Sequence, residues 1–219
     1  MYATLRTHPQ IMQHGEILNH RHKYDLSDDG YQRFVDALNA DLHPTRSTLV
    51  AIGCNMHAFQ PDRTWAHWQK WERAWDALAD DRSVKVVLLR RLDALAQLAS
   101  WRIAYQLGEW GIQPATIERP TVRLDPHELR WFMRWNQMLF EKRLSYLTNH
   151  EILPITYESL CDDWDETIRR VQAFLGVNVL SLRQPFSKNE TRPLEDVVEN
   201  IKTLRRVQGQ EAAYYEGGP

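Results

Sequence analysis

Two adjacent arginines stand where they could bind an anion. Arg90 and Arg91 follow residues 84–89, an aliphatic and mostly β-branched run that is typical of a strand buried on both faces. Asp93 is a good helix N-cap residue, and the Ala/Leu/Gln run after it predicts a helix over 93–110. Free N–H groups at a helix N-terminus, together with guanidinium charge, favour the binding of a phosphate-like group.

Ser100 extends the same pattern. It lies seven residues after Asp93, which is about two helical turns, so it occupies roughly the same face as the helix start. Its hydroxyl could donate a second hydrogen bond to the same anion. An ordinary surface arginine pair beside a helix serine is the alternative, and this segment alone leaves both interpretations open.

Composition limits the class of protein. The chain has 219 residues, a net charge of −2 and 43% hydrophobic residues, which suits one folded α/β domain. No global field favours nucleic acid or an anionic membrane, and no apolar run is long enough to span a bilayer. Cys54 and Cys161 are distant in sequence and predict reduced thiols in a cytoplasmic protein, and the scattered histidines predict no metal site.

Short apolar segments alternate with segments of helical period. Strands are predicted over 48–53, 84–89 and 152–157, and residues 3–11 read as a helix tail broken by Pro9. Helices are predicted over 28–40, 64–79, 93–110, 125–148, 162–175 and 193–207. This alternation predicts one domain, residues 1–219, with a parallel sheet and helices on both faces. The helically spaced tryptophans are predicted to pack in the core: Trp65, Trp68, Trp71, Trp75, Trp131 and Trp135.

The pattern R-x-D-x-x-x-Q-x-x-S after an apolar strand resembles a known phosphate-binding segment. It is similar to the 3′-phosphate segment of sulfotransferases that use 3′-phosphoadenosine 5′-phosphosulfate (PAPS), in particular the bacterial carbohydrate and lipid branch with the nodulation-type enzymes. The resemblance implies that Arg91 and Ser100 bind the 3′-phosphate of the donor. It also implies a three-layer, P-loop-like α/β fold and sulfuryl transfer to a hydroxyl of a carbohydrate or glycolipid.

Later motifs occur in the family's order. The segment I-T-Y-E-S-L resembles one in which Tyr157 would border the adenine, although Tyr157 fits a core aromatic equally well. Gly176 closes an F-L-G-V motif and suits the left-handed residue that ends a helix. In K-N-E-T-R-P-L, Lys188 and Arg192 would reach phosphate, with a solvated basic turn as the alternative, and Thr191 is predicted to cap the next helix.

Two residues are candidates for the base that accepts the proton of the acceptor hydroxyl. Glu16 lies where the family's acceptor pocket begins, and His57 resembles the histidine of a K-x-H motif. Asn55 replaces the lysine of that motif, so a satisfied buried histidine is an equal reading of His57. A surface glutamate near a turn is the alternative for Glu16.

The family's phosphosulfate loop has no counterpart within residues 1–219. The motif L-x-x-H-P-x-I at 5–11 follows that loop in the family, so the first strand and the loop are expected upstream of Met1 and the domain is expected to be N-terminally incomplete. The alternative function is a truncated or degenerate relative that acts as a nucleotide-binding or interaction domain without catalysis. The expected partners are the nucleotide donor and a hydroxyl-bearing acceptor, and a homodimer is left open.

Overall fold

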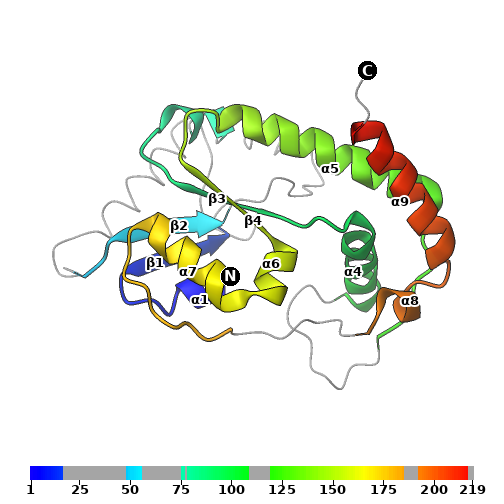
Figure 1. Cartoon of the computed structure of the whole chain (residues 1–219), viewed down its shortest axis with the longest axis horizontal. Helices are drawn as coiled ribbons and strands as arrows, with labels where there is room; N and C mark the ends of the chain where they lie inside the picture. The colour runs from blue at the N-terminus through cyan, green and yellow to red at the C-terminus, as the bar shows by residue number, and fades with distance from the viewer. Residues whose placement is uncertain (17–47, 56–74, 77, 109–118, 185–191, 217–219) are drawn as a thin grey trace. The chain divides into compact units, whose positions relative to one another are not determined.

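The computed structural model describes residues 1–16, 48–55, 75–76, 78–108, 119–184 and 192–216 (Figure 1). The chain divides into two compact units, which the sequence alone did not suggest. The first unit comprises Met1–Arg90 with Leu139–Pro185, and the second comprises Arg91–Met138 with Phe186–Pro219. The single domain predicted over 1–219 stays a prediction.

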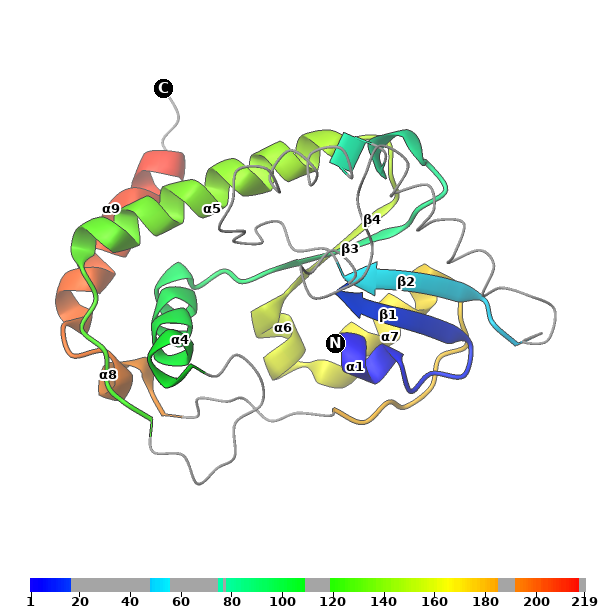
Figure 2. The same ribbon diagram turned by 180° about the vertical axis from the view of Figure 1, so that it is seen from behind.

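Two pairs of parallel strands belong to the first unit (Figures 1 and 2). Strand β1 (Ile11–Glu16) pairs with β2 (Ala51–Asn55), and β3 (Val86–Arg90) pairs with β4 (Ile152–Thr156). Strands β2, β3 and β4 lie at or beside the three predicted ranges, and their parallel pairing agrees with the predicted α/β class. The described strands form two pairs instead of one central sheet, and the P-loop-like arrangement stays a prediction.

Strand β1 is the strand that the sequence pattern did not indicate. Helix α1 (Tyr2–Leu5) ends before Pro9, as expected of a helix tail, and the chain then enters β1. The polar Gln13 and His14 interrupt the apolar character of this segment, so no strand signal stands out. Ile11 nevertheless lies opposite Ala51 in the ladder, because pairing with a neighbouring strand outweighs a weak local pattern.

The first unit has a core shared by both strand pairs. Ile11 of β1 and Ile155 of β4 are both buried in the same cluster. Helix α6 (Tyr157–Asp162) and helix α7 (Trp164–Leu175) cover it, with Ile168 and Val171 on the apolar stripe of α7. Gly176 ends α7 in the left-handed conformation with φ 75°, as its motif predicts.

Buried polar side chains form hydrogen bonds with the backbone of the loop that follows α7. Gln172 is fully buried, its amide nitrogen donates to the Leu180 carbonyl at 3.1 Å, and its Oε1 accepts from the Leu180 N–H at 2.9 Å. The Nε2 of His8 lies 2.8 Å from the Asn178 carbonyl oxygen, and its Nδ1 accepts from the Gln10 N–H at 3.1 Å. The histidine of the L-x-x-H-P-x-I motif therefore has a structural role here.

Helices form the second unit. These are α4 (Ala94–Leu107), α8 (Leu194–Val197), α9 (Ile201–Glu216) and the first part of α5 (Pro126–Tyr146), which continues past Met138 into the first unit. The core of the unit contains residues of all four of these helices and of the segments between them. Its fully buried leucines are Leu95, Leu98, Leu129 and Leu204.

Local contacts move several helix boundaries away from their predicted positions. Helix α4 stops at Leu107 because Gly108 adopts φ 66° and its N–H bonds back to the last turn. The predicted helix 193–207 is two helices, since Val198 is extended and forms a parallel bridge with Val122. Pro193 occupies the N-cap of α8 without a side-chain cap bond, whereas Thr191, the predicted cap, lies outside the described residues. The predicted helix 28–40 and most of 64–79 lie outside the described residues.

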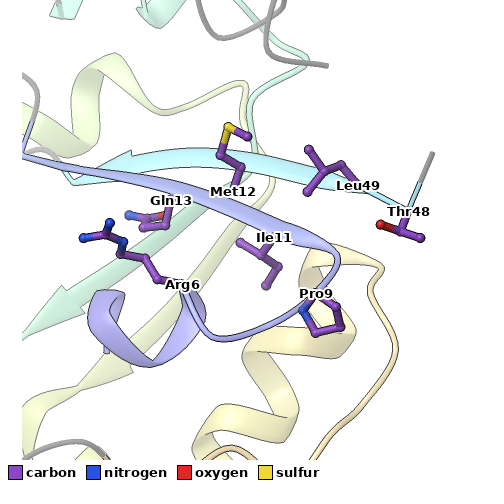
Figure 3. A pocket seen from close by; sticks show the side chains of 7 residues that line it. All are labelled: Arg6, Pro9, Ile11, Met12, Gln13, Thr48 and Leu49. Carbon is purple, nitrogen blue, oxygen red and sulfur yellow. The ribbon is translucent and has the colours of Figure 1, made fainter. Parts of the chain in front are cut away.

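Each unit contains a shallow cavity among its described residues. One, of about 370 Å³, lies in the first unit with Arg6 and Gln13 among its lining residues (Figure 3). The other, of about 390 Å³, lies in the second unit and is lined in part by Arg123 and Asn200. Of the predicted site residues that the structure describes, none lines either cavity.

Candidate functional site

Strands β3 and β4 end together. In their parallel register Arg90 lies opposite Thr156, and these are the last residues of the two strands. The next residues along the chain are Arg91 after β3 and Tyr157 after β4. Ligands of parallel α/β sheets bind beyond the carboxyl ends of the strands, and each of these two residues follows such an end in sequence.

The two neighbouring arginines have different surroundings. The guanidinium carbon of Arg90 lies 4.3 Å from the ring centroid of Phe140, which is the geometry of a cation–π contact. Arg91 is half-buried and is the first residue of the second unit. The motif, by its spacing to Asp93 and Ser100, indicates Arg91 as the candidate for phosphate.

Asp93 is the N-cap of α4, as predicted. Its backbone is extended and its Oδ1 accepts from the Ala96 N–H at 3.0 Å. The sequence interpretation counted the N–H groups of this helix start as free for an anion, and for Ala96 that is wrong, because Asp93 already occupies it. An anion beside this helix would depend more on Arg91 than on the backbone.

Two side chains of α9 hold the same carboxylate. Arg205 Nη1 donates to Asp93 Oδ2 at 3.1 Å, and Gln208 Nε2 donates to Asp93 Oδ1 at 3.2 Å. Arg205 Nη1 also donates to Gln208 Oε1 at 2.9 Å, so the two α9 side chains support each other. Burial raises the pKa of Asp93, but the hydrogen bonds from Ala96, Gln208 and Arg205 outweigh it and hold the pKa below the ordinary value.

The lowered pKa of Asp93 predicts an acid-sensitive contact between α4 and α9. A carboxylate with a depressed folded-state pKa stabilises the fold above its unfolded pKa of about 4, and the contribution is lost as pH falls through the folded pKa. We expect Asp93→Asn to lower the free energy of unfolding at pH 7, and this difference from the wild type to shrink below about pH 4. Urea unfolding of both proteins from pH 7 to 3 measures it, and a difference that grows on acidification would contradict the assignment.

Ser100 is exposed on α4. It follows Ala96 by four residues and so lies one turn further along the same helix face. Its neighbours Leu98 and Ala99 are buried in the core of the second unit, which fixes the orientation of this helix. Arg91 therefore precedes the N-cap of α4 by two residues, and Ser100 lies within this helix with its side chain exposed.

Tyr157 is the first residue of α6. Thr156 caps this helix by accepting from the Ser159 N–H at 2.9 Å, and Ser159 Oγ accepts in return from the Thr156 N–H at 3.2 Å. The motif I-T-Y-E-S-L therefore encodes a strand end followed by a capping box, which sequence analysis did not identify. Tyr157 is half-buried in the first unit, whereas Arg91 belongs to the second.

The structure describes only some of the remaining predicted site residues. Arg192 is half-buried and its Nη2 donates to the Pro120 carbonyl at 3.5 Å, within the second unit. Glu16 is the last residue of β1, where its backbone pairs with Asn55. His57 and Lys188 lie outside the described residues. Their predicted roles stay predictions.

Within residues 1–16, 48–55 and the later described segments, no three His, Cys, Asp or Glu side chains are close enough to hold a metal ion. None of the described helices is both long enough and apolar enough to cross a membrane.

Comparison with known proteins gives one informative relative. The chain is 28% identical to Nodulation protein H of Rhizobium tropici over 229 aligned positions, which cover 99% of this chain and 84% of that protein. No protein-family profile matches the chain, and no solved structure matches it. Similarity over almost the whole chain agrees with the ordered motifs from Arg91 onward.

Proposed function

We propose that this protein transfers a sulfuryl group from PAPS to a hydroxyl of a carbohydrate or glycolipid. The observation that carries the proposal is the segment from β3 to Ser100, in which a strand end, Arg91 and a capped helix follow one another. Its support is the similarity to Nodulation protein H, which extends over 99% of this chain. The two cysteines, far apart in sequence, suit a reduced cytoplasmic location.

The reaction forms one bond and breaks one. The acceptor oxygen bonds to sulfur, the bond from sulfur to the bridging phosphate oxygen breaks, and adenosine 3′,5′-bisphosphate leaves with that electron pair. The acceptor proton passes to a base, for which Glu16 and His57 are the candidates. Catalysis of this kind rests on positioning and charge stabilisation more than on covalent chemistry.

In this proposal, different residues bind different parts of the donor. Arg91 and Ser100 hold the 3′-phosphate, Arg91 through charge-assisted hydrogen bonds and Ser100 through its hydroxyl. Tyr157 borders the adenine, and Lys188 and Arg192 reach the phosphates from the segment before α8. No metal ion is needed for these contacts.

We expect Arg91→Ala to weaken the binding of adenosine 3′,5′-bisphosphate by more than tenfold. A lost charge-assisted hydrogen bond to phosphate costs about 1.5–3 kcal/mol. Isothermal titration calorimetry measures it, and adenosine 5′-monophosphate, which lacks the 3′-phosphate, should bind wild type and variant alike. This test does not depend on turnover.

The neighbouring arginine supplies a matched control. Arg90→Ala removes the same charge one residue earlier, but its guanidinium stacks on Phe140, so the affinity for the bisphosphate should stay close to that of the wild type. Equal binding by wild type and Arg91→Ala would reject the proposed site. Binding of the bisphosphate without any sulfuryl transfer from PAPS would favour the non-catalytic alternative.

A further inference from the structure

We propose that Arg205 is a positioning residue of the 3′-phosphate site, which it serves by neutralising the carboxylate of Asp93. This inference rests on the proposed function, because it concerns the phosphate bound at Arg91 and Ser100. It assigns a role to α9, whose residues carry none of the motifs that identify the family.

The site contains an anion of its own. Asp93 stands two residues after Arg91 and caps the helix that bears Ser100. Its side chain is partly buried, with 30% of its surface exposed. An uncompensated carboxylate here would repel the phosphate and cancel much of the attraction of Arg91. A helix cap at a phosphate site therefore needs a nearby cation.

Arg205 meets this need. Its Nη1 lies 3.1 Å from Asp93 Oδ2, whereas Asp93 Oδ1 accepts from Ala96 and Gln208. Both carboxylate oxygens are thus hydrogen-bonded, and the local sum over Arg91, Asp93 and Arg205 is one positive charge. All of these residues belong to the second unit. Gln208 Oε1 accepts from the same Nη1, and this bond within α9 holds the Arg205 guanidinium beside Asp93.

Substitutions can separate neutralisation from direct contact with the ligand. Asparagine is as good an N-cap as aspartate, so Asp93→Asn keeps the helix cap while removing the charge. If Arg205 acts through Asp93, the variant Arg205→Gln should bind phosphate poorly, and the double variant Arg205→Gln with Asp93→Asn should recover. If Arg205 itself contacts the phosphate, the double variant should stay weak.

The experiment is calorimetric titration of adenosine 3′,5′-bisphosphate and of adenosine 5′-monophosphate into wild type, Arg205→Gln, Asp93→Asn and the double variant. We expect Arg205→Gln to weaken bisphosphate binding at least about fivefold, the lower range of site-to-site coupling. Monophosphate binding should not change, and the double variant should return to within about twofold of the wild type. Arg206→Gln is the matched control, since it removes the same charge from the next, exposed residue of α9.

Each failure has its own signature. A wild type that binds both nucleotides equally would overturn the proposed function and this inference with it. A wild type that prefers the bisphosphate, with Arg205→Gln and Arg206→Gln indistinguishable from each other, would overturn the inference alone. So would a double variant that binds the bisphosphate weakly although its thermal unfolding matches that of Asp93→Asn.

Discussion

We expect Leu98→Ala to lower the free energy of unfolding by about 2–5 kcal/mol, the range for removing a buried leucine side chain. Leu98 is fully buried and packs in the core cluster of the second unit together with Leu95 and Leu204. Its truncation leaves a cavity beside the helix that carries Asp93 and Ser100. Urea unfolding followed by tryptophan fluorescence measures the change.

An exposed residue of the same helix provides the control. Gln106 lies on the solvent side of α4, and Gln106→Ala should change the free energy of unfolding by no more than about 0.5 kcal/mol. Similar losses in the two variants would show that α4 is not packed as described. A loss confined to Leu98→Ala would tie the stability of the second unit to the helix beneath the proposed phosphate site.

Apolar runs and capping residues were sufficient to predict much of the fold. The pairing of β3 with β4 and the αL residue Gly176 agree with the sequence patterns. The prediction that residues 84–89 are buried on both faces is wrong, because no residue of β3 is fully buried and Leu89 is 46% exposed. β1 could not be predicted in this way, because Gln13 and His14 dilute its pattern and its ladder partner is forty residues away. Such a strand is stabilised by its neighbour more than by its own residues.

Helical spacing alone does not say which face of a helix is buried. The tryptophans were predicted to be core residues, and Trp75, at 6% exposure, confirms this for its own position, whereas Trp65, Trp68 and Trp71 lie outside the described residues. Trp131 is 58% exposed and stacks on Trp135 with ring centroids 5.6 Å apart, so its prediction was wrong. Trp75 follows Trp71 by four residues, and Trp135 follows Trp131 by four residues, so the spacing in the two pairs is the same. Only the packing of the neighbouring helices distinguishes the buried Trp75 from the exposed Trp131.

The site was predictable only where its residues are close in sequence. Arg91, Asp93 and Ser100 fall within ten residues and share a recognisable pattern. Arg205 lies 112 residues beyond Asp93, and no local pattern marks it as the partner of a helix cap. The same holds for His8 and its bond to Asn178, which are 170 residues apart. Contacts of this separation depend on the tertiary fold.

Glu211 is the second residue whose loss should have a large effect. Its side chain is only 7% exposed, and Arg134 donates to both of its oxygens, at 2.9 and 3.1 Å. Arg130 Nε lies 3.6 Å from the same carboxylate, so two arginines of α5 hold α9 through it. We expect Glu211→Ala to lower the free energy of unfolding by about 1.5–3 kcal/mol, the range for hydrogen bonds to a charged group. The value is not higher because Arg134 is 59% exposed and can be rehydrated.

An exposed pair with the same geometry isolates the effect of burial. Arg169 also donates to both oxygens of Glu166, at 2.7 and 2.6 Å, but both side chains are open to solvent. Surface ion pairs contribute little to stability, so Glu166→Ala should leave urea unfolding unchanged within error. In 1 M salt, where the Debye length is about 3 Å, screening should remove any small stabilisation by the exposed pair. The difference in the free energy of unfolding between Glu211→Ala and the wild type should persist. Equal losses for the two variants would show that burial of Glu211 does not set the strength of the link between α5 and α9.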